Sequence, residues 1–173
     1  NGCAASATNS ITVVINSLPT ASTVNLSGPT QFCKGGNVTL SVPLTAGYSY
    51  SWRNENGFIA GTGSNTYTAS ASGKYQLKIS NTSGCSVLTS PVNVTAKLIP
   101  DKPVITSDFK QGECPGVNKI LLNVSPVNTG YNYQWSRNGV LLSNETASSL
   151  EGYLLHGDYS LEADLNGCKA QSE

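Results

Sequence analysis

The sequence predicts an all-β protein made of two tandem antiparallel β-sandwich domains, and three observations lead to this prediction. The stretch GYSYSW at 47–52 returns as GYNYQW at 130–135, so that Trp52 and Trp135 end two matching stretches. In both copies the aromatic residues occupy every second position, which places them on one face of a strand. No segment keeps a helical period of 3.6 residues, and the nearest, residues 150–156, has the length of a loop.

The first repeat is a series of short strands separated by turn signals. A strand is expected near residues 22–26, followed by Gly- and Pro-containing turns. Val38, Leu40 and Val42 alternate with polar residues, which predicts a half-buried strand. Further strands are expected at residues 48–52, 58–59, 66–68 and 75–79, and an Asn-Gly hairpin turn precedes residue 58.

The second repeat follows the same order, which fixes the expected domain boundaries. Residues 120–124 match residues 38–42, the Asn-Gly turn at 138–139 matches that at 56–57, and the Gly-Asp-Tyr at 157–159 matches Gly-Lys-Tyr at 73–75. Residues 1–16 resemble the text around residues 83–95 and are expected to be the last strand of a preceding repeat. We expect domain 1 at residues 17–98 and domain 2 at residues 99–173, with its last strand truncated, in a fragment of a longer tandem array.

Composition favours an extracytoplasmic protein without nucleic-acid or membrane partners. Charged residues make up 12% of the chain and the net charge is zero, so no basic patch invites nucleic acid. No apolar run approaches the roughly 18 residues of a membrane helix, so no direct membrane insertion is expected. Five cysteines in a Ser-, Thr- and Asn-rich all-β pattern indicate an oxidising compartment.

No catalytic, cofactor or metal site is expected. The only histidine, His156, occurs in one repeat, which favours a loop residue over a general base. The cysteines form no Cys-x-x-Cys pair, which argues against zinc, and the carboxylates lack the density of a calcium loop. Asp158, Glu162 and Asp164 are expected to form a solvated strand face that discourages edge pairing.

Exposed aromatic residues are the remaining candidates for a binding surface. Phe58, Tyr67 and Tyr153 could stack on sugars, because most other aromatic residues fall on predicted core faces. Arg53 and Arg137 flank the two tryptophans at places that are not equivalent, so a shared site built on them is not expected.

Three features together resemble an immunoglobulin-type (Ig-type) sandwich: an alternating strand, a tryptophan that ends the next strand, and Gly-x-Tyr before a later strand. The resemblance implies that Trp52 and Trp135 are core residues and that the hydroxyls of Tyr75 and Tyr159 tie back to the preceding corner. The inter-sheet disulfide of antibody domains is absent. Its places are held by aliphatic residues: Val42, Leu77, Val124 and Leu161.

The order Cys, Gly, alternating strand, Tyr-x-Trp, Gly-x-Tyr and Gly-Cys is similar to tandem Ig-like repeats of Bacteroidota cell-surface proteins, such as gliding-motility adhesins exported by the type IX secretion system. The similarity covers nearly the whole chain and implies an extracellular, cell-surface location. It also implies neighbouring Ig-like repeats of the same chain as partners, with surface polysaccharide or another surface protein as further candidates.

The disulfide candidates are Cys33, Cys85, Cys114 and Cys168, and two pairings stay open. Bonds within the domains would join Cys33 to Cys85 and Cys114 to Cys168. In the sandwich topology, however, Cys33 and Cys85 lie at opposite poles, roughly 20 Å apart, whereas a disulfide needs Cα atoms within about 7 Å. We therefore prefer Cys33 with Cys168 across the joint, which leaves Cys85 and Cys114 for a preceding and a following repeat. Cys3 belongs to the preceding repeat in either pairing.

The sequence offers no catalytic constellation and favours a non-enzymatic role. The resemblance implies stiff Ig-like repeats that form the stalk of a secreted or surface-anchored bacterial adhesin, involved in surface adhesion or gliding motility. The alternative is an accessory or carbohydrate-binding module of a secreted enzyme, and a third class is a receptor ectodomain.

Overall fold

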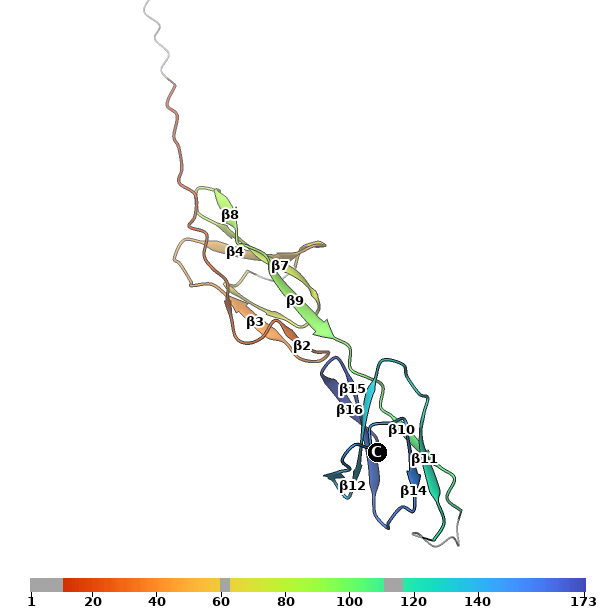
Figure 1. Ribbon diagram of the computed structural model, residues 1–173. Coiled ribbons are helices and arrows are strands. Elements are labelled where there is room, and N and C mark those ends of the chain that lie inside the picture. The colour runs from red at the N-terminus through yellow and green to blue at the C-terminus, as the bar shows by residue number, and fades with distance from the viewer. Residues whose placement is uncertain (1–10, 60–62, 111–116) are drawn as a thin grey trace, which may run out of the picture. The chain divides into compact units, whose positions relative to one another are not determined.

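The computed structural model describes residues 11–59, 63–110 and 117–173, which form strands and turns (Figure 1). Among these residues no helix is long and apolar enough to span a membrane. The chain divides into two compact units: residues Asn1–Thr30 with Val38–Val94 form unit 1, and Gln31–Asn37 with Thr95–Glu173 form unit 2. Residues 11–24 form no strand and residues 1–10 lie outside the described part, so the assignment of 1–16 to a preceding repeat stays a prediction.

Unit 1 has two antiparallel layers. One sheet has the order β1 (Asn25–Leu26), β3 (Val38–Ser41), β6 (Thr66–Ala69). The other places β4 (Ser49–Asn54) between β5 (Gly57–Phe58) and β7 (Gly73–Ser80), and the far edge of β7 pairs with β8 (Ser86–Leu88) and β9 (Val92–Lys97). The strand expected at residues 22–26 is therefore shorter than predicted.

The core of unit 1 follows from period-2 alternation. In β7 the buried residues Tyr75, Leu77 and Ile79 alternate with residues that keep contact with solvent. Trp52 on β4 lies opposite Leu77 and is fully buried. Its ring centroid is 5.9 Å from that of Tyr67 on the other sheet, so aromatic packing joins the layers.

Unit 2 repeats this arrangement. One sheet has the order β10 (Val104–Ser107), β11 (Ile120–Ser125), β14 (Ser149–Gly152), and the other has the order β13 (Val140–Leu141), β12 (Asn132–Arg137), β15 (Tyr159–Leu165), β16 (Cys168–Gln171). Trp135 lies opposite Leu161, and both are fully buried. Leu150 belongs to β14 and to the core, although the sequence indicated a loop from residue 150, because its ladder with β11 is a long-range contact.

The four aliphatic residues at the places of the antibody disulfide are all buried: Val42, Leu77, Val124 and Leu161. Both layers of unit 2 contribute to one apolar cluster, in which β11 and β14 face β12 and β15. Apolar packing therefore holds the two sheets together at these positions.

One short strand of the first repeat belongs to unit 2. β2 (Gln31–Cys33) pairs in parallel with the end of β9, where Gln31 faces Thr95 and Cys33 faces Lys97. The earlier part of β9 pairs with β7 in unit 1, so the chain passes between the units at residues 30–31, 37–38 and 94–95.

Candidate functional site

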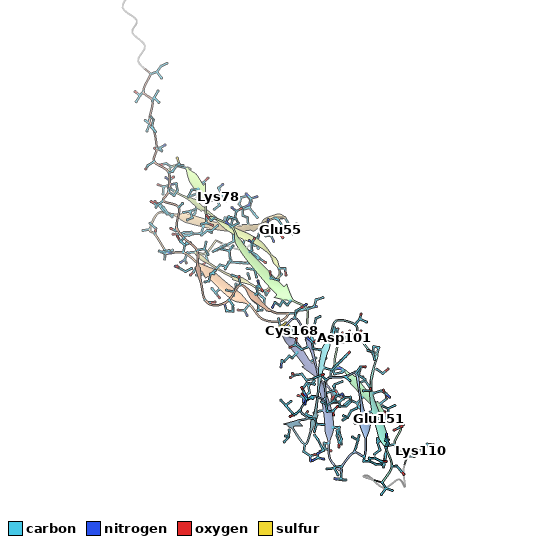
Figure 2. The ribbon with its side chains drawn as sticks, viewed as in Figure 1. Glu55, Lys78, Asp101, Lys110, Glu151 and Cys168 are labelled. Atoms are coloured by element: carbon cyan, nitrogen blue, oxygen red, sulfur yellow. A yellow bond between two sulfur atoms is a disulfide. The ribbon has the colours of Figure 1, made fainter. Side chains whose placement is uncertain are left out.

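A disulfide joins Cys33, the last residue of β2, to Cys168, the first residue of β16. Figure 2 labels Cys168. The Cα atoms of the two cysteines lie 5.6 Å apart, although their sequence separation is 135. Of the two open pairings, this is the one preferred from the sequence. Both cysteines lie in the residues assigned to unit 2, and Cys33 cannot at the same time pair with Cys85.

Backbone hydrogen bonds position the Cys33 side of this bond. The Lys34 amide donates to the Lys97 carbonyl (2.7 Å), which extends the pairing of β2 with β9 by one residue. The Gly36 amide donates to the Cys33 carbonyl (2.9 Å) and closes the loop. A Cβ at Gly36 would lie 3.2 Å from that carbonyl and 3.2 Å from the Phe32 ring, so the tight loop favours glycine.

A hairpin turn positions the Cys168 side. Asn166 and Gly167 both have positive φ, 54° and 86°, which joins β15 to β16 in a two-residue turn. The Asp164 carboxylate accepts a hydrogen bond from the Gly167 amide (2.8 Å), and the Lys97 ammonium donates to the Asn166 carbonyl (3.1 Å). The cysteine that follows is 1% exposed, so the disulfide is shielded from solvent on this side.

Cys85 lies at the end of the corresponding, longer turn of the first repeat, between β7 and β8. The Asn81 side-chain oxygen accepts hydrogen bonds from the Ser83 and Cys85 amides (3.1 and 3.0 Å), and Gly84 has a φ of 80°. Cys85 is a free thiol, half-buried, with its sulfur 3.9 Å from the Asn16 carbonyl oxygen. Cys3 and Cys114 lie outside the described residues, so the predicted partners of Cys114 stay a prediction.

The four core aromatic residues named from the sequence make matching hydrogen bonds in the two repeats. The indole nitrogens of Trp52 and Trp135 donate to the carbonyls of Ser64 (3.1 Å) and Ala147 (2.9 Å). The hydroxyls of Tyr75 and Tyr159 donate to the carbonyls four residues earlier, at 3.0 and 2.9 Å. Tyr75 is 3% exposed, and burial raises the pKa of its hydroxyl, whereas Tyr159 is only half-buried.

His156 lies at the edge of an apolar groove of about 280 Å³ in unit 2. The groove is also lined by Phe109, Leu154, Leu155 and Tyr159. In the described ranges, no group of three or more His, Cys, Asp or Glu side chains comes together in a way that could hold a metal ion. The groove offers apolar contact and a single imidazole.

Phe58 is the exposed aromatic residue with a defined polar setting. Its side chain is 61% exposed, with the Arg53 guanidinium carbon 5.6 Å and the Lys78 ammonium 5.8 Å from the ring centroid. Tyr153 is 62% exposed, whereas Tyr67 packs between Trp52 and Tyr75 and is only half-buried. The quadrupole of an aromatic ring attracts cations to its face, so Arg53 and Lys78 are held beside the Phe58 ring.

Among the carboxylates of β15, Glu162 is paired with Lys169 on the neighbouring β16. The Lys169 nitrogen lies 2.6 Å from the Glu162 oxygen, and this hydrogen bond raises the pKa of the lysine. Asp158 is exposed and Asp164 is half-buried, so these carboxylates keep contact with solvent.

A side-chain clamp at the start of β7 and its counterpart near β15 were missed in the sequence. The Glu55 carboxylate accepts a hydrogen bond from the Lys74 amide (2.8 Å), and the Asn138 side chain accepts one from the Asp158 amide (2.8 Å) at the matching place. Because Asn54 pairs with Gly57, the first hairpin turns at residues 55–56 and not at the predicted Asn-Gly pair 56–57. Arg137 pairs with Val140, so the second hairpin turns at residues 138–139, as predicted. Matching the two Asn-Gly pairs set the repeats one residue out of register and concealed the equivalence of Glu55 and Asn138.

A second missed feature joins a hydroxyl residue to the middle of each of these strands. Thr89 bonds to Leu77 in unit 1, and Ser172 bonds to Leu161 in unit 2, each through its backbone amide and its side-chain oxygen. The signal available in the sequence was a hydroxyl residue at equivalent positions of both repeats.

No protein-family model and no curated protein matches this sequence. Among solved structures, a chain in the crystal structure of the mouse coronavirus receptor-binding domain complexed with its murine receptor is similar, with a TM-score of 0.52 and 15% identity over 87% of this chain and 96% of that chain. Murine CEACAM1b gives a TM-score of 0.45 and 17% identity over 87% and 96%. The fibronectin(III)-like modules of Clostridium thermocellum CbhA give 0.44 and 14% over 87% and 90%.

The fold is therefore that of two tandem Ig-like β-sandwiches. The first of these similarities and the two-layered antiparallel sheets agree on this point. At such low identity the likeness is one of fold, and function has to be argued from the residues of this chain.

Proposed function

We propose that the chain works without enzymatic chemistry, as a pair of Ig-like repeats in the stiff stalk of a secreted or surface-anchored bacterial adhesin involved in surface adhesion or gliding motility. The observation that carries the proposal is the disulfide between Cys33 and Cys168. Disulfides persist in oxidising compartments, which supports an extracellular location. Cys33 comes from the first sequence repeat and Cys168 from the second, so the bond is a covalent link between repeats in addition to the peptide chain. Repeats joined only by a linker are normally free to hinge, and a second covalent link reduces that freedom.

The disulfide changes the path that a pulling force takes through the molecule. Tension along the chain enters at Cys33, crosses the sulfur bridge and leaves at Cys168. The intervening residues, which include most strands of both sandwiches, lie in a closed loop and carry no tension. A stalk built in this way resists extension even where its small domains are only marginally stable.

Single-molecule force spectroscopy on the fragment, held by its two ends, tests this role. In the oxidised chain the disulfide should keep its 135-residue loop from extending, so the contour length measured on unfolding should be shorter by roughly 450 Å. Cys33→Ser/Cys168→Ser should release that length when the sandwiches unfold. Equal contour lengths for the two proteins would contradict a load-bearing disulfide.

The proposal extends to the neighbouring repeats of an array. Cys85 follows the first repeat's Asn-capped turn as Cys168 follows the turn of the second. If the pairing repeats, Cys85 bonds the early cysteine of a preceding repeat and Cys114 the late cysteine of a following one. A fragment lengthened by one preceding repeat should protect Cys85 from alkylation, and a reactive Cys85 there would contradict the array.

Surface exposure is a separate part of the proposal and has its own test. Antibodies raised against the fragment should label intact cells of the source organism, and external protease should remove that label. Signal that appears only after the cells are lysed would place the protein inside and overturn the adhesin assignment.

One observation favours the alternative of a carbohydrate-binding module. Phe58 is exposed between two cations, which is a setting able to stack on a sugar and pair with its carboxylate. Binding of the fragment to immobilised polysaccharides, lost in Phe58→Ala, would support this alternative.

A further inference from the structure

The net charge of the chain is zero, but its two units carry opposite net charges. Unit 1 contains three cations, Arg53, Lys74 and Lys78, against one carboxylate, Glu55, and so has a net charge of +2. Unit 2 contains seven cations against nine carboxylates, a net charge of −2. The halves of the molecule are therefore complementary in charge.

All three cations of unit 1 lie on the outward face of one sheet. In β7, Lys74 and Lys78 alternate with the buried Tyr75 and Leu77, and in β4 Arg53 follows the buried Trp52. Phe58 pairs with Arg53 across β4 and β5, and Figure 2 labels Lys78 and Glu55 in this unit. We call Arg53, Phe58, Lys74 and Lys78 the basic face.

The corresponding face of unit 2 has the opposite sign at matching positions. Asp158 and Glu162 take the places in the second repeat that Lys74 and Lys78 hold in the first. Asp164 is next on β15, and Leu141, which is 67% exposed, takes the place of Phe58. The cation facing this surface from β16 is Lys169, which pairs with Glu162, so three carboxylates meet one ammonium. We call Leu141, Asp158, Glu162 and Asp164 the acidic face.

We propose that the basic face of unit 1 binds the acidic face of unit 2 on a second copy of this chain. The two faces are built on equivalent strands, so their side chains have the same spacing and can be placed opposite one another. An exposed apolar side chain on each face, Phe58 or Leu141, provides an uncharged contact between the charged positions. Contacts between like faces are disfavoured by repulsion, so the association pairs unlike faces.

An acidic polysaccharide is the competing occupant of the basic face. It accounts for Phe58 and its cations, but it leaves the reversal of charge at the matching positions of unit 2 unexplained. A second copy accounts for both faces at once and is therefore the occupant that the observations favour.

Sedimentation velocity on the oxidised chain, with free thiols alkylated, tests the contact from about 1 µM to about 1 mM protein. We expect concentration-dependent association at low salt and at least about a tenfold weaker association constant in about 0.5 M NaCl, because salt screens exposed charges. Lys74→Glu/Lys78→Glu makes both faces acidic, and Asp158→Lys/Glu162→Lys makes both basic. Each variant alone should stay monomeric, and an equimolar mixture of the two should associate like the wild type.

The mixture is also a control for folding, since variants that had lost their structure could not restore binding. Lys119→Glu/Glu151→Lys exchanges the charges of an exposed ion pair at the other sheet of unit 2, leaves the net charge unchanged and should associate like the wild type. A wild type that stays monomeric throughout, or a mixture that fails to associate, would overturn the proposal. Monomeric wild type that binds alginate, with loss of binding in Lys74→Glu/Lys78→Glu, would instead assign the basic face to polysaccharide.

Discussion

At the scale of single residues, a tyrosine near the start of β7 and of β15 closes the same corner in each repeat. The hydroxyls of Tyr75 and Tyr159 donate to the carbonyls of Ala71 and Leu155. Tyr75→Phe and Tyr159→Phe keep the rings and remove the hydrogen bonds, so we expect each to lower the free energy of unfolding by about 1 kcal/mol. Urea denaturation measures the change, and Tyr153→Phe at an exposed position should change stability by less than about 0.5 kcal/mol.

Glu55 gives unit 1 a pH dependence that its counterpart in unit 2 lacks. The hydrogen bond from the Lys74 amide, more than any other interaction, lowers the pKa of the Glu55 carboxyl. Because the folded-state pKa is the lower one, the stabilisation is fully present above the usual glutamate pKa and is lost as pH falls through the lowered value. In unit 2 the matching acceptor is the side-chain amide of Asn138, which does not titrate in this range.

We therefore expect the Lys74 amide to lose protection from hydrogen exchange between neutral pH and about pH 3, once intrinsic exchange rates are taken into account. In Glu55→Gln, which copies the chemistry of Asn138, protection of this amide should not depend on pH over that range. The same loss of protection in both proteins would show that another group is responsible.

At the scale of strands, the chain that pairs with the outer edge of β7 is broken into two strands. β8 and β9 both pair with β7, and the break between them contains Thr89 and Pro91. The Thr89 amide donates to the Leu77 carbonyl (3.0 Å), and its hydroxyl accepts from the Leu77 amide (3.0 Å). Ser172 makes the same two contacts with Leu161 in unit 2.

Thr89→Val keeps the shape of this buried side chain but leaves the Leu77 amide without its acceptor. An unsatisfied buried donor costs about 1–3 kcal/mol, so we expect unit 1 to lose that much stability. Hydrogen exchange of the β7 amides measures it separately from unit 2. Thr89→Ser retains the hydroxyl and should lose less than half as much, while equal losses would mean that methyl packing is what matters.

The strands show where sequence patterns suffice and where they do not. Alternation predicted β3, β4, β7 and β11 because each buries one face in its own sandwich. The pairing of β2 with the end of β9 and the place of Leu150 in β14 depend on partners distant in the sequence, which local periodicity does not encode. The expected sandwich topology favoured Cys33 with Cys168 over the alternative bonds within the repeats, whereas the turns that bring their Cα atoms to 5.6 Å required the structure.

At the scale of the whole molecule, the disulfide closes a loop of 135 residues. Closing a loop of this length restricts the unfolded chain, and a bond of this kind is worth about 2–5 kcal/mol. We expect Cys33→Ser/Cys168→Ser to lower the free energy of unfolding by an amount in that range in urea. Cys85→Ser, at a free thiol, should leave it within about 0.5 kcal/mol of the wild type.

Identifying the partner of Cys33 in the disulfide is the most direct test of the stalk proposal. A tryptic digest can do this, because it separates most of the cysteines. With free thiols blocked before digestion, cleavage after lysine and arginine separates Cys85, Cys114 and Cys168 into peptides 79–97, 111–119 and 138–169. Peptide 1–34 holds both Cys3 and Cys33, so the digest is made on Cys3→Ser. We expect peptide 1–34 linked to peptide 138–169 in the mass spectrum, whereas peptide 1–34 linked to 79–97 would contradict the shared load path and leave two independent domains.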